Sequence, residues 1–211
     1  MPGRRARSTS SAQNPAGAHF LTDRALIARL VRASGVGQGD LVFDLGAGYG
    51  ALTGPLARTG ARVIAIERDQ RLAGRLRRRF AGTGQVSVVE ADLRSVPLPR
   101  RPFYVVASPP FALTTLLCRR LLGDPAIRLA GAELIVEWGA ALWLSARQPR
   151  DKELAYWAAR YELRLVRRVP AACFSPAPAS DAGYLMVRPR ARRASDRPNA
   201  HLTVPSSPAQ R

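Results

Sequence analysis

The segment Leu41–Gly50 joins an apolar run with strand character to a glycine-rich turn. Gly46, Gly48 and Gly50 allow the backbone to turn sharply and leave room for a ligand to approach it, because glycine lacks a Cβ atom. A helix is predicted directly afterwards, over residues 50–59. A strand, a glycine turn and a helix in this order are typical of the first unit of a nucleotide-binding α/β sheet.

The central region repeats this alternation. Short apolar runs are separated by segments whose apolar residues recur with helical spacing, which predicts a mostly parallel sheet with crossover helices. Strands are predicted at 41–45, 62–66, 86–90, 103–107, 132–137, about 160–168 and 184–188, and further helices after a Thr22–Asp23 cap and at 69–79, 113–122 and 151–157. Seven strands with helices on both faces make a doubly wound, Rossmann-like α/β domain.

The chain has 211 residues, which is enough for one large domain, and we expect residues 18–188 to form it. Residues 1–17 and 189–211 are rich in Arg, Ser and Pro without periodicity, which predicts a basic flexible N-terminal tail and a Pro/Arg-rich flexible C-terminal tail. Lys and Arg number 33 against 15 Asp and Glu, a net charge of +18. This excess favours a polyanionic partner such as nucleic acid.

Cys118 and Cys173 are far apart and no histidine cluster accompanies them. The pattern indicates neither a disulfide framework nor a metal site, and we expect two buried, reduced thiols. No apolar stretch is long enough to span a bilayer, and no apolar region follows the N-terminal arginines. We therefore expect a cytoplasmic protein with no membrane partner, and a monomer by default.

Three acidic residues lie at the carboxyl ends of the first three strands of the predicted parallel sheet. Asp44, two residues before the first glycine, is suited to organise the glycine loop near the charged amino-acid end of a ligand. Glu67 ends the next strand, about 20 residues further on, where it is suited to hold ribose hydroxyls. Asp92 follows the third strand and can accept a hydrogen bond from an adenine amino group. The turn also fits a dinucleotide fingerprint, so both S-adenosylmethionine and a nicotinamide cofactor are open at this point.

The fourth predicted strand ends in the motif Ser108-Pro109-Pro110-Phe111. The exocyclic amine of adenine is a poor nucleophile because its lone pair is conjugated with the ring. The Ser108 hydroxyl and the Pro109 carbonyl can accept both hydrogens of that amine and orient its lone pair, while the prolines fix the backbone. Phe111 offers a face on which an extruded base can stack. The motif favours methyl transfer to a base amine over hydride transfer.

Taken together, these motifs resemble the rRNA adenine N6-methyltransferases. Within that family the sequence most resembles the Erm branch, the macrolide-lincosamide-streptogramin B resistance 23S rRNA methyltransferases. The resemblance covers roughly residues 13–188. It implies a class I S-adenosylmethionine-dependent enzyme that methylates one adenine of 23S rRNA near the peptidyl-transferase centre, in naked RNA or in a precursor particle. The segments that carry it are His19-Phe20-Leu21, Asp44–Gly50, Glu67, Asp92, Ser108–Phe111 and Phe174-Ser175-Pro176-x-Pro178.

The resemblance also implies roles for individual residues. Phe111 and Phe174 would enclose the flipped adenine, and no general base is required because the N–H becomes acidic once the nitrogen is alkylated. Catalysis would depend on positioning and desolvation. The implied catalytic residues are Ser108, Pro109, Phe111 and Phe174, and the implied cofactor-binding residues are His19, Leu21, Asp44, Gly46, Gly48, Glu67, Asp92 and Ser108.

The sequence departs from the family pattern in three places. Ser108 stands where the family usually has Asn, and because a hydroxyl has less reach than an amide we expect weaker activity or transfer of a single methyl group. His19 stands where Asn is common. Residues 189–211 are too short and too rich in Pro to build the C-terminal helical domain of the family, so most of that domain is expected to be lacking.

RNA contact is then expected from the sheet domain and its tails. The candidate basic clusters are Arg75, Arg77, Arg78 and Arg79; Arg100 and Arg101; Arg119 and Arg120; and Arg164, Arg167 and Arg168. We expect Trp138, Trp143 and Trp157 to be packing residues, while a stacking role remains open. Small-subunit rRNA methylation, DNA adenine methylation and a non-catalytic RNA-binding role on the same fold are alternatives that the motifs leave open.

Overall fold

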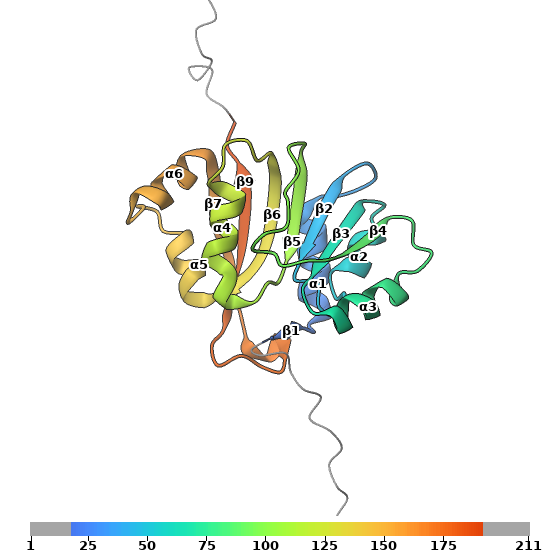
Figure 1. Ribbon diagram of the computed structural model, residues 1–211. Helices are drawn as coiled ribbons and strands as arrows, with labels where there is room; N and C mark the ends of the chain where they lie inside the picture. The colour runs from blue at the N-terminus through green and yellow to red at the C-terminus, as the bar shows by residue number, and fades with distance from the viewer. Residues whose placement is uncertain (1–17, 192–211) are drawn as a thin grey trace, which may run out of the picture.

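The computed structural model describes residues 18–191, so the tail predicted at 1–17 and all but three residues of the tail predicted at 189–211 lie outside the described residues. A seven-stranded sheet with the order β4-β3-β2-β5-β6-β9-β7 forms the centre of the molecule (Figure 1). β4, β3, β2, β5 and β6 run parallel, and β9 is antiparallel to both β6 and β7. The predicted doubly wound α/β fold is confirmed.

The elements follow the predicted alternation closely. The strands are β1 Phe20–Leu21, β2 Leu41–Leu45, β3 Arg62–Glu67, β4 Val86–Glu90, β5 Phe103–Ala107, β6 Leu129–Glu137, β7 Tyr161–Val169, β8 Phe174–Ser175 and β9 Ala182–Pro189. The helices are α1 Arg24–Ser34, α2 Thr53–Ala57, α3 Gln70–Arg79, α4 Thr114–Leu122, α5 Trp138–Leu144 and α6 Lys152–Arg160, with short 3-10 turns at Phe111–Leu113 and Ala171–Cys173.

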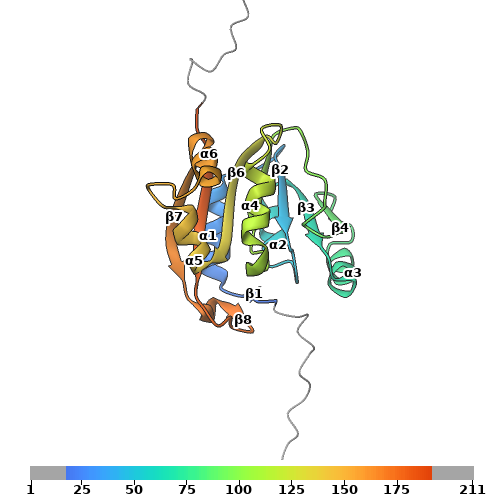
Figure 2. The same ribbon diagram turned by 60° about the vertical axis from the view of Figure 1, so that its left-hand side comes forward.

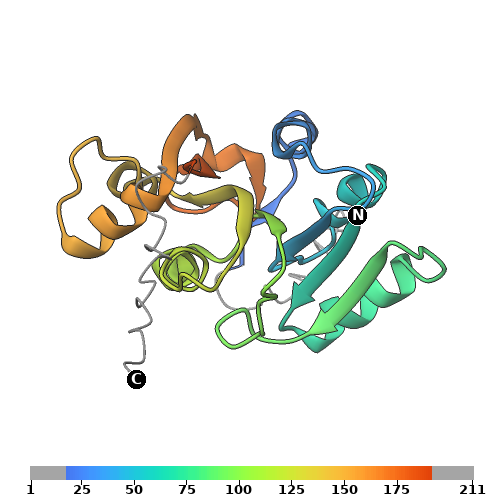
Figure 3. The same cartoon turned by 90° about the horizontal axis from the view of Figure 1, so that it is seen from above.

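Helices cover both faces of the sheet. α1, α2 and α3 pack on one face and α4, α5 and α6 on the other (Figures 1 and 2). Seen from above, α1 in blue and α4 in yellow-green lie on opposite sides of the sheet (Figure 3). The predicted cap of α1 is formed by Asp23, whose carboxylate accepts a 2.7 Å hydrogen bond from the Leu26 N–H. Gly35, with φ of 66°, ends the helix.

Three features of the structure differ from the sequence prediction. Helix α2 begins only at Thr53, because the glycine turn extends through Gly50 at positive φ. Helix α5 follows β6 without a loop and is capped by Glu137, whose carboxylate accepts a 2.9 Å hydrogen bond from the Ala140 N–H. β1 and β8 form a two-stranded antiparallel ribbon apart from the main sheet. Strands of two residues carry no apolar alternation, so the pattern does not reveal them.

Trp143 and Trp157 pack together, whereas Trp138 is half-buried and belongs to none of the core clusters. Trp157 is fully buried, and its ring meets that of Trp143 edge to face with 6.1 Å between centroids. Trp138 lies beneath the guanidinium of Arg168, whose Cζ is 5.1 Å from the ring centroid. None of the helices within residues 18–191 is long and apolar enough to cross a membrane.

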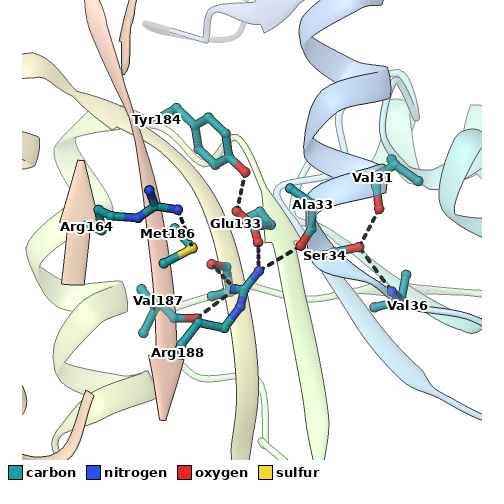
Figure 4. Close-up of polar contacts among 11 residues, drawn as sticks. Val31, Ala33, Ser34, Val36, Glu133, Arg164, Tyr184, Met186, Val187 and Arg188 are labelled. Atoms are coloured by element: carbon teal, nitrogen blue, oxygen red, sulfur yellow. Dashed lines mark hydrogen bonds and ion pairs between the residues drawn. The ribbon is translucent and has the colours of Figure 1, made fainter. Parts of the chain in front are cut away.

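A buried charge cluster joins the sheet to α1 (Figure 4). Glu133 on β6 is completely buried, accepts a hydrogen bond from the Tyr184 hydroxyl and forms an ion pair with Arg188. Burial, reinforced by the hydrogen bond to Glu133, raises the pKa of Tyr184. Arg188 also donates a 2.8 Å hydrogen bond to the carbonyl of Ala33 near the end of α1. The cluster therefore fixes the far end of α1 against β6 and β9.

Candidate active site

A pocket of about 570 Å³ opens at the carboxyl ends of β2, β3, β4 and β5, at the lower edge of the sheet in Figure 1. Open α/β sheets bind ligands at this edge where the strand order reverses, and β2 lies at that point between β3 and β5. The volume is in the range of small-molecule sites. Six of the predicted site residues line the pocket: His19, Gly46, Gly48, Glu67, Asp92 and Ser108.

The glycine turn forms the floor of this pocket. Gly46 and Gly48 have φ of 81° and 53°, a region that disfavours other residues. A Cβ atom on Gly48 would lie 2.8 Å from a ring carbon of Phe20. The N–H groups of Gly46 and Ala47 both donate 2.9 Å hydrogen bonds to the Ile66 carbonyl, which ties the turn to β3. The turn thus brings bare backbone to the pocket wall.

Glu67 closes the turn from the end of β3. Its Oε2 accepts a 2.8 Å hydrogen bond from the Gly48 N–H, and its Oε1 accepts one of 2.8 Å from the Asp69 N–H. Each carboxylate oxygen has two lone pairs, so one on each oxygen remains for a ligand. Glu67 can therefore hold the turn and a pair of ligand hydroxyls at the same time.

Asp44 lies behind the turn and does not line the pocket. Its side chain is buried, and its Oδ2 accepts a 2.6 Å hydrogen bond from the hydroxyl of Thr53 at the start of α2. Burial raises the pKa of Asp44 to about 7, although the bond from Thr53 opposes the shift. The structure makes Asp44 a positioning residue that fixes α2 relative to β2. The predicted role of Asp44 in organising the glycine loop near a ligand stays a prediction.

Asp92 lines the pocket beyond β4 and is held by arginines. Arg94 donates to it from its backbone N–H at 2.8 Å, from Nε at 2.9 Å and from Nη2 at 2.6 Å. The guanidinium of Arg68 lies 3.7 Å away. The hydrogen bonds from Arg94 lower the pKa of Asp92 to about 2. The carboxylate is therefore ionised. Its Oδ2 accepts two of these bonds and its Oδ1 only one, so a lone pair on Oδ1 remains for a further donor.

Ser108 carries an unusual hydroxyl. Its Oγ atom is buried and finds no hydrogen-bond partner within the described part of the chain. Buried hydroxyl groups almost always have a partner, so this atom has capacity for a ligand donor. Pro110 Cδ and Pro109 Cα lie 3.4 and 3.5 Å from the position of a Cβ on Gly46. The Pro-Pro segment thus touches the glycine turn and places Ser108 beside it.

The aromatic residues form a cluster next to the pocket. The rings of Phe111 and Phe174 meet edge to face, with centroids 5.9 Å apart and planes at 84°. Phe174 is buried and Phe111 is half-buried, so only Phe111 presents much of its ring. The ring centroids of His19 and Phe111 are 6.1 Å apart. The two phenylalanines do not form a parallel slot for a base in this conformation. Leu21 belongs to β1 of the ribbon, is buried in the core cluster beside α1, and does not line the pocket.

Some pocket residues are absent from the sequence-based site prediction. Phe20 lines the pocket and packs against Tyr49 with 4.6 Å between ring centroids. Its position between His19 and Leu21 was the only signal available. Arg68, Asp69 and Gln70 also line the pocket. They follow β3 directly, as expected for a loop at the carboxyl edge, but their residue types have no special pattern.

Several of the candidate basic residues have partners within the protein. Ion pairs join Arg77 to Glu90, Arg119 to Glu153 and Arg168 to Asp181. Arg120 is half-buried and donates to the carbonyls of Leu93 and Val96, so its role is structural. The expectation for the cysteines needs one correction: Cys118 is buried, whereas Cys173 is only half-buried and lines a second pocket.

The chain has relatives among known proteins. Residues 10–202 match the family described as ribosomal RNA adenine dimethylase. An rRNA adenine N-6-methyltransferase of Bacillus licheniformis is 29% identical over 89% of this chain and 64% of its own length. The mycinamicin-resistance protein MyrB of Micromonospora griseorubida is 34% identical over 89% of this chain and 61% of its own length. This chain thus spans less than two thirds of the length of either relative.

A solved structure shows the same likeness. The crystal structure of the 23S rRNA methyltransferase ErmE superposes with a TM-score of 0.75 and 28% identity, over 82% of this chain and 70% of that one. The shared architecture is the seven-stranded methyltransferase sheet described above. The family match spans most of the chain and includes every pocket residue named here. This chain belongs to the ribosomal RNA adenine dimethylase family.

Proposed function

We propose that this protein transfers a methyl group from S-adenosylmethionine to the exocyclic N6 of an adenine in 23S rRNA, near the peptidyl-transferase centre, and so confers macrolide-lincosamide-streptogramin B resistance. Membership in the family and similarity to MyrB and ErmE support this assignment. The observation that carries the chemistry is the buried Ser108 hydroxyl beside the glycine turn, which has no hydrogen-bond partner among residues 18–191.

The residues of the pocket fit this cofactor. Glu67 keeps a free lone pair on each oxygen for the two ribose hydroxyls, and Asp92 offers an ionised carboxylate to the adenine amine. The bare backbone at Gly46 and Gly48 leaves room for the methionine end, with His19 on the other side. When bound, S-adenosylmethionine supplies an electrophilic methyl group on a positively charged sulfur.

Ser108 and Pro109 orient the target amine. The Ser108 Oγ and the Pro109 carbonyl each accept one N–H, which directs the nitrogen lone pair toward the methyl carbon. S-adenosylmethionine would supply its methyl carbon to this lone pair, and the electrons of the S–C bond would stay on sulfur. The proton then leaves the alkylated nitrogen for water, so no side chain has to act as a base. Phe111 offers its face to the extruded adenine, and Phe174 supports Phe111 from behind.

The short reach of Ser108 bears on the number of methyl groups. A hydroxyl on one carbon reaches less far than the amide that is usual at this position in the family. After the first transfer the amine has one N–H left and carries added bulk. We infer that the product is N6-methyladenosine and that a second transfer is slow.

Methyl transfer to defined nucleic acids tests the proposal. The full chain is incubated with labelled S-adenosylmethionine and, separately, 23S rRNA, 16S rRNA and duplex DNA, and the product nucleosides are identified by mass spectrometry. N6-methyladenosine in the 23S RNA alone, lost in Phe111→Ala, supports the proposal. Label in 16S RNA or DNA instead overturns the target. Cofactor binding with no label in any substrate overturns the catalytic assignment in favour of RNA binding alone.

A further inference from the structure

A second pocket of about 310 Å³ lies between α1 and the end of β7, away from the glycine turn. Three arginines line it: Arg29 and Arg32 from α1 and Arg167 from β7. Between the arginines the pocket is lined by residues that are apolar or small, namely Leu26, Val169, Ala25, Ala28 and Pro170. An apolar floor with a ring of guanidinium groups suits an anion that is small and hydrogen-bonds in several directions.

Helix α1 builds one wall through its spacing. Arg29 and Arg32 are three residues apart, so they lie on the same face of the helix as Ala25 and Ala28. All four residues are exposed, while the buried Leu26 lies next to them at the base of the groove and Ile27 and Leu30 pack into the core. The small alanines leave the groove open between the arginines and β7.

A β-bulge supplies the third arginine. The pairing of β7 with β9 shifts between Leu165 and Arg167, so Val166 is an extra residue in β7. Leu165 pairs with Leu185, and Arg167 pairs with Tyr184, whose side chain belongs to the core cluster on the α1 face. Without the bulge, Arg167 would share the face of Leu165. The bulge turns the Arg167 side chain toward α1.

The charges of the groove are not neutralised within the described residues. Of the arginines paired with carboxylates among residues 18–191, none is Arg29, Arg32 or Arg167. The one carboxylate in the groove is Asp23, which already accepts the capping hydrogen bond from the Leu26 N–H. Three cations against one anion leave the groove positive.

The β1–β8 ribbon connects the groove to the candidate active site. At one end of the ribbon, His19 of the first pocket contacts the Pro176 carbonyl through Nδ1 at 3.0 Å. At the other end, the Thr22 N–H donates to the Cys173 carbonyl at 2.8 Å, and Cys173 lines the groove. Three residues of extended chain lie between His19 and Asp23, and the four residue steps span about 13 Å. One nucleic-acid strand can reach both pockets.

We propose that the groove formed by Arg29, Arg32 and Arg167 binds a backbone phosphate of the RNA substrate, a few nucleotides from the adenine at Ser108. The inference rests on the proposed function, since it takes the partner to be RNA. A phosphodiester oxygen pair matches the fork of a guanidinium, and the phosphate adds no base specificity. The groove therefore sets where the strand lies, while the first pocket selects the base.

Salt-dependent RNA binding by the full chain tests this inference. The variant Arg29→Gln/Arg32→Gln/Arg167→Gln is compared with Arg58→Gln/Arg62→Gln/Arg128→Gln, in which three exposed arginines are changed near the amino ends of β3 and β6, opposite the site. RNA affinity is measured over a range of KCl concentrations, and cofactor affinity by calorimetry. Arg29→Lys/Arg32→Lys/Arg167→Lys keeps the charge and serves as the conservative rescue.

The groove variant is expected to bind RNA about tenfold more weakly or worse. The slope of log K against log salt should become shallower by about 0.7 to 0.9 for each phosphate that the variant no longer neutralises, while its cofactor affinity stays unchanged. The lysine variant should recover the salt dependence, and the control variant should keep wild-type affinity. Equal reductions of affinity in the groove and control variants, or wild-type RNA binding in the groove variant, overturn the inference.

Two further outcomes separate this inference from the proposed function. If the wild type binds RNA through the groove but methylates none, the proposed function fails and the groove stands. If the wild type methylates 23S RNA and the groove variant does so equally well at every salt concentration, the groove inference fails alone. A groove that binds inorganic phosphate, with no effect of the glutamine changes on RNA affinity, also overturns it.

Discussion

The Oε2 atom of Glu67 accepts a 2.8 Å hydrogen bond from the backbone N–H of Gly48. The residue that ends β3 thus holds the turn that follows β2, and it does so with the same carboxylate that faces the pocket. Ligand recognition and the shape of the turn are coupled through this one side chain. A change at Glu67 is expected to affect both.

Glu67→Gln is expected to weaken cofactor binding at least tenfold. The amide NH2 group must face either the Gly48 or the Asp69 N–H, which places two donors against each other and costs about 1–3 kcal/mol. Calorimetric titration with S-adenosylmethionine and thermal unfolding measure the two effects. The matched control is Glu90→Gln, because Glu90 pairs with Glu67 in the sheet register but lies outside the pocket. Equal affinity in the two variants would contradict the prediction.

Asp44 predicts a pH-dependent stability. Its pKa is about 7 in the folded protein and 3.8 ordinarily, so between these values the folded state binds one more proton than the unfolded state. The contribution of Asp44 to the free energy of unfolding is fully present below about pH 4. As the pH rises from there toward 7, this contribution is lost at about 1.4 kcal/mol per pH unit. The free energy of unfolding from urea titrations at pH 5, 6 and 7 should fall more steeply in wild type than in Asp44→Asn. Parallel curves for the two proteins would rule this out.

Ser108 and Thr114 allow function to be separated from stability. Both carry a buried hydroxyl oxygen without a hydrogen-bond partner among the described residues, but only Ser108 lines the pocket. Removing an unpaired buried hydroxyl relieves a desolvation penalty of about 1–3 kcal/mol, so Ser108→Ala and Thr114→Val should be as stable as wild type or more stable. Methyl transfer should fall at least tenfold in Ser108→Ala and stay unchanged in Thr114→Val. Unchanged transfer in Ser108→Ala would remove the proposed role of the hydroxyl.

The Glu133–Arg188 pair predicts a non-additive effect on folding. Arg188→Met leaves the carboxylate of Glu133 buried without its cation, which should lower the free energy of unfolding by about 3–5 kcal/mol. Glu133→Leu/Arg188→Met removes both charges and should recover most of that stability. Urea unfolding of wild type, the two single variants Arg188→Met and Glu133→Leu, and the double variant measures the coupling. A double variant that is no more stable than Arg188→Met would show that the pair is not coupled.

The sequence predicts the main sheet well because its signals are local. Apolar runs mark the strands within a few residues, and β4 and β5 have the predicted bounds. The same local patterns predict the glycine turn and the acidic residues at the strand ends. The prediction therefore includes Glu67 and Asp92, which both line the pocket. The β1–β8 ribbon escapes prediction because it joins segments about 150 residues apart, as in the bond from Thr22 to the Cys173 carbonyl.

Residue type alone also could not separate Asp44 from Glu67. Both are acidic residues near the carboxyl ends of neighbouring strands, yet Asp44 is buried against Thr53 while Glu67 faces the pocket. This difference in burial arises because α2 packs over the side of β2 from which the Asp44 side chain extends. Likewise, Arg167 and Arg168 look equivalent as neighbours in a basic run. The bulge at Val166 sends the first toward α1, and the second pairs with Asp181 near Trp138.

The sequence by itself determines the order of strands and helices, the glycine turn and the chemistry present at each strand end. These depend on side-chain periodicity and on backbone freedom within a few residues, both of which are written locally in the chain. Only the tertiary structure decides which polar groups share a pocket, which hydroxyl is left without a partner and which arginines converge beside α1. Those outcomes come from contacts between distant segments, whose geometry is fixed when the helices pack onto the sheet.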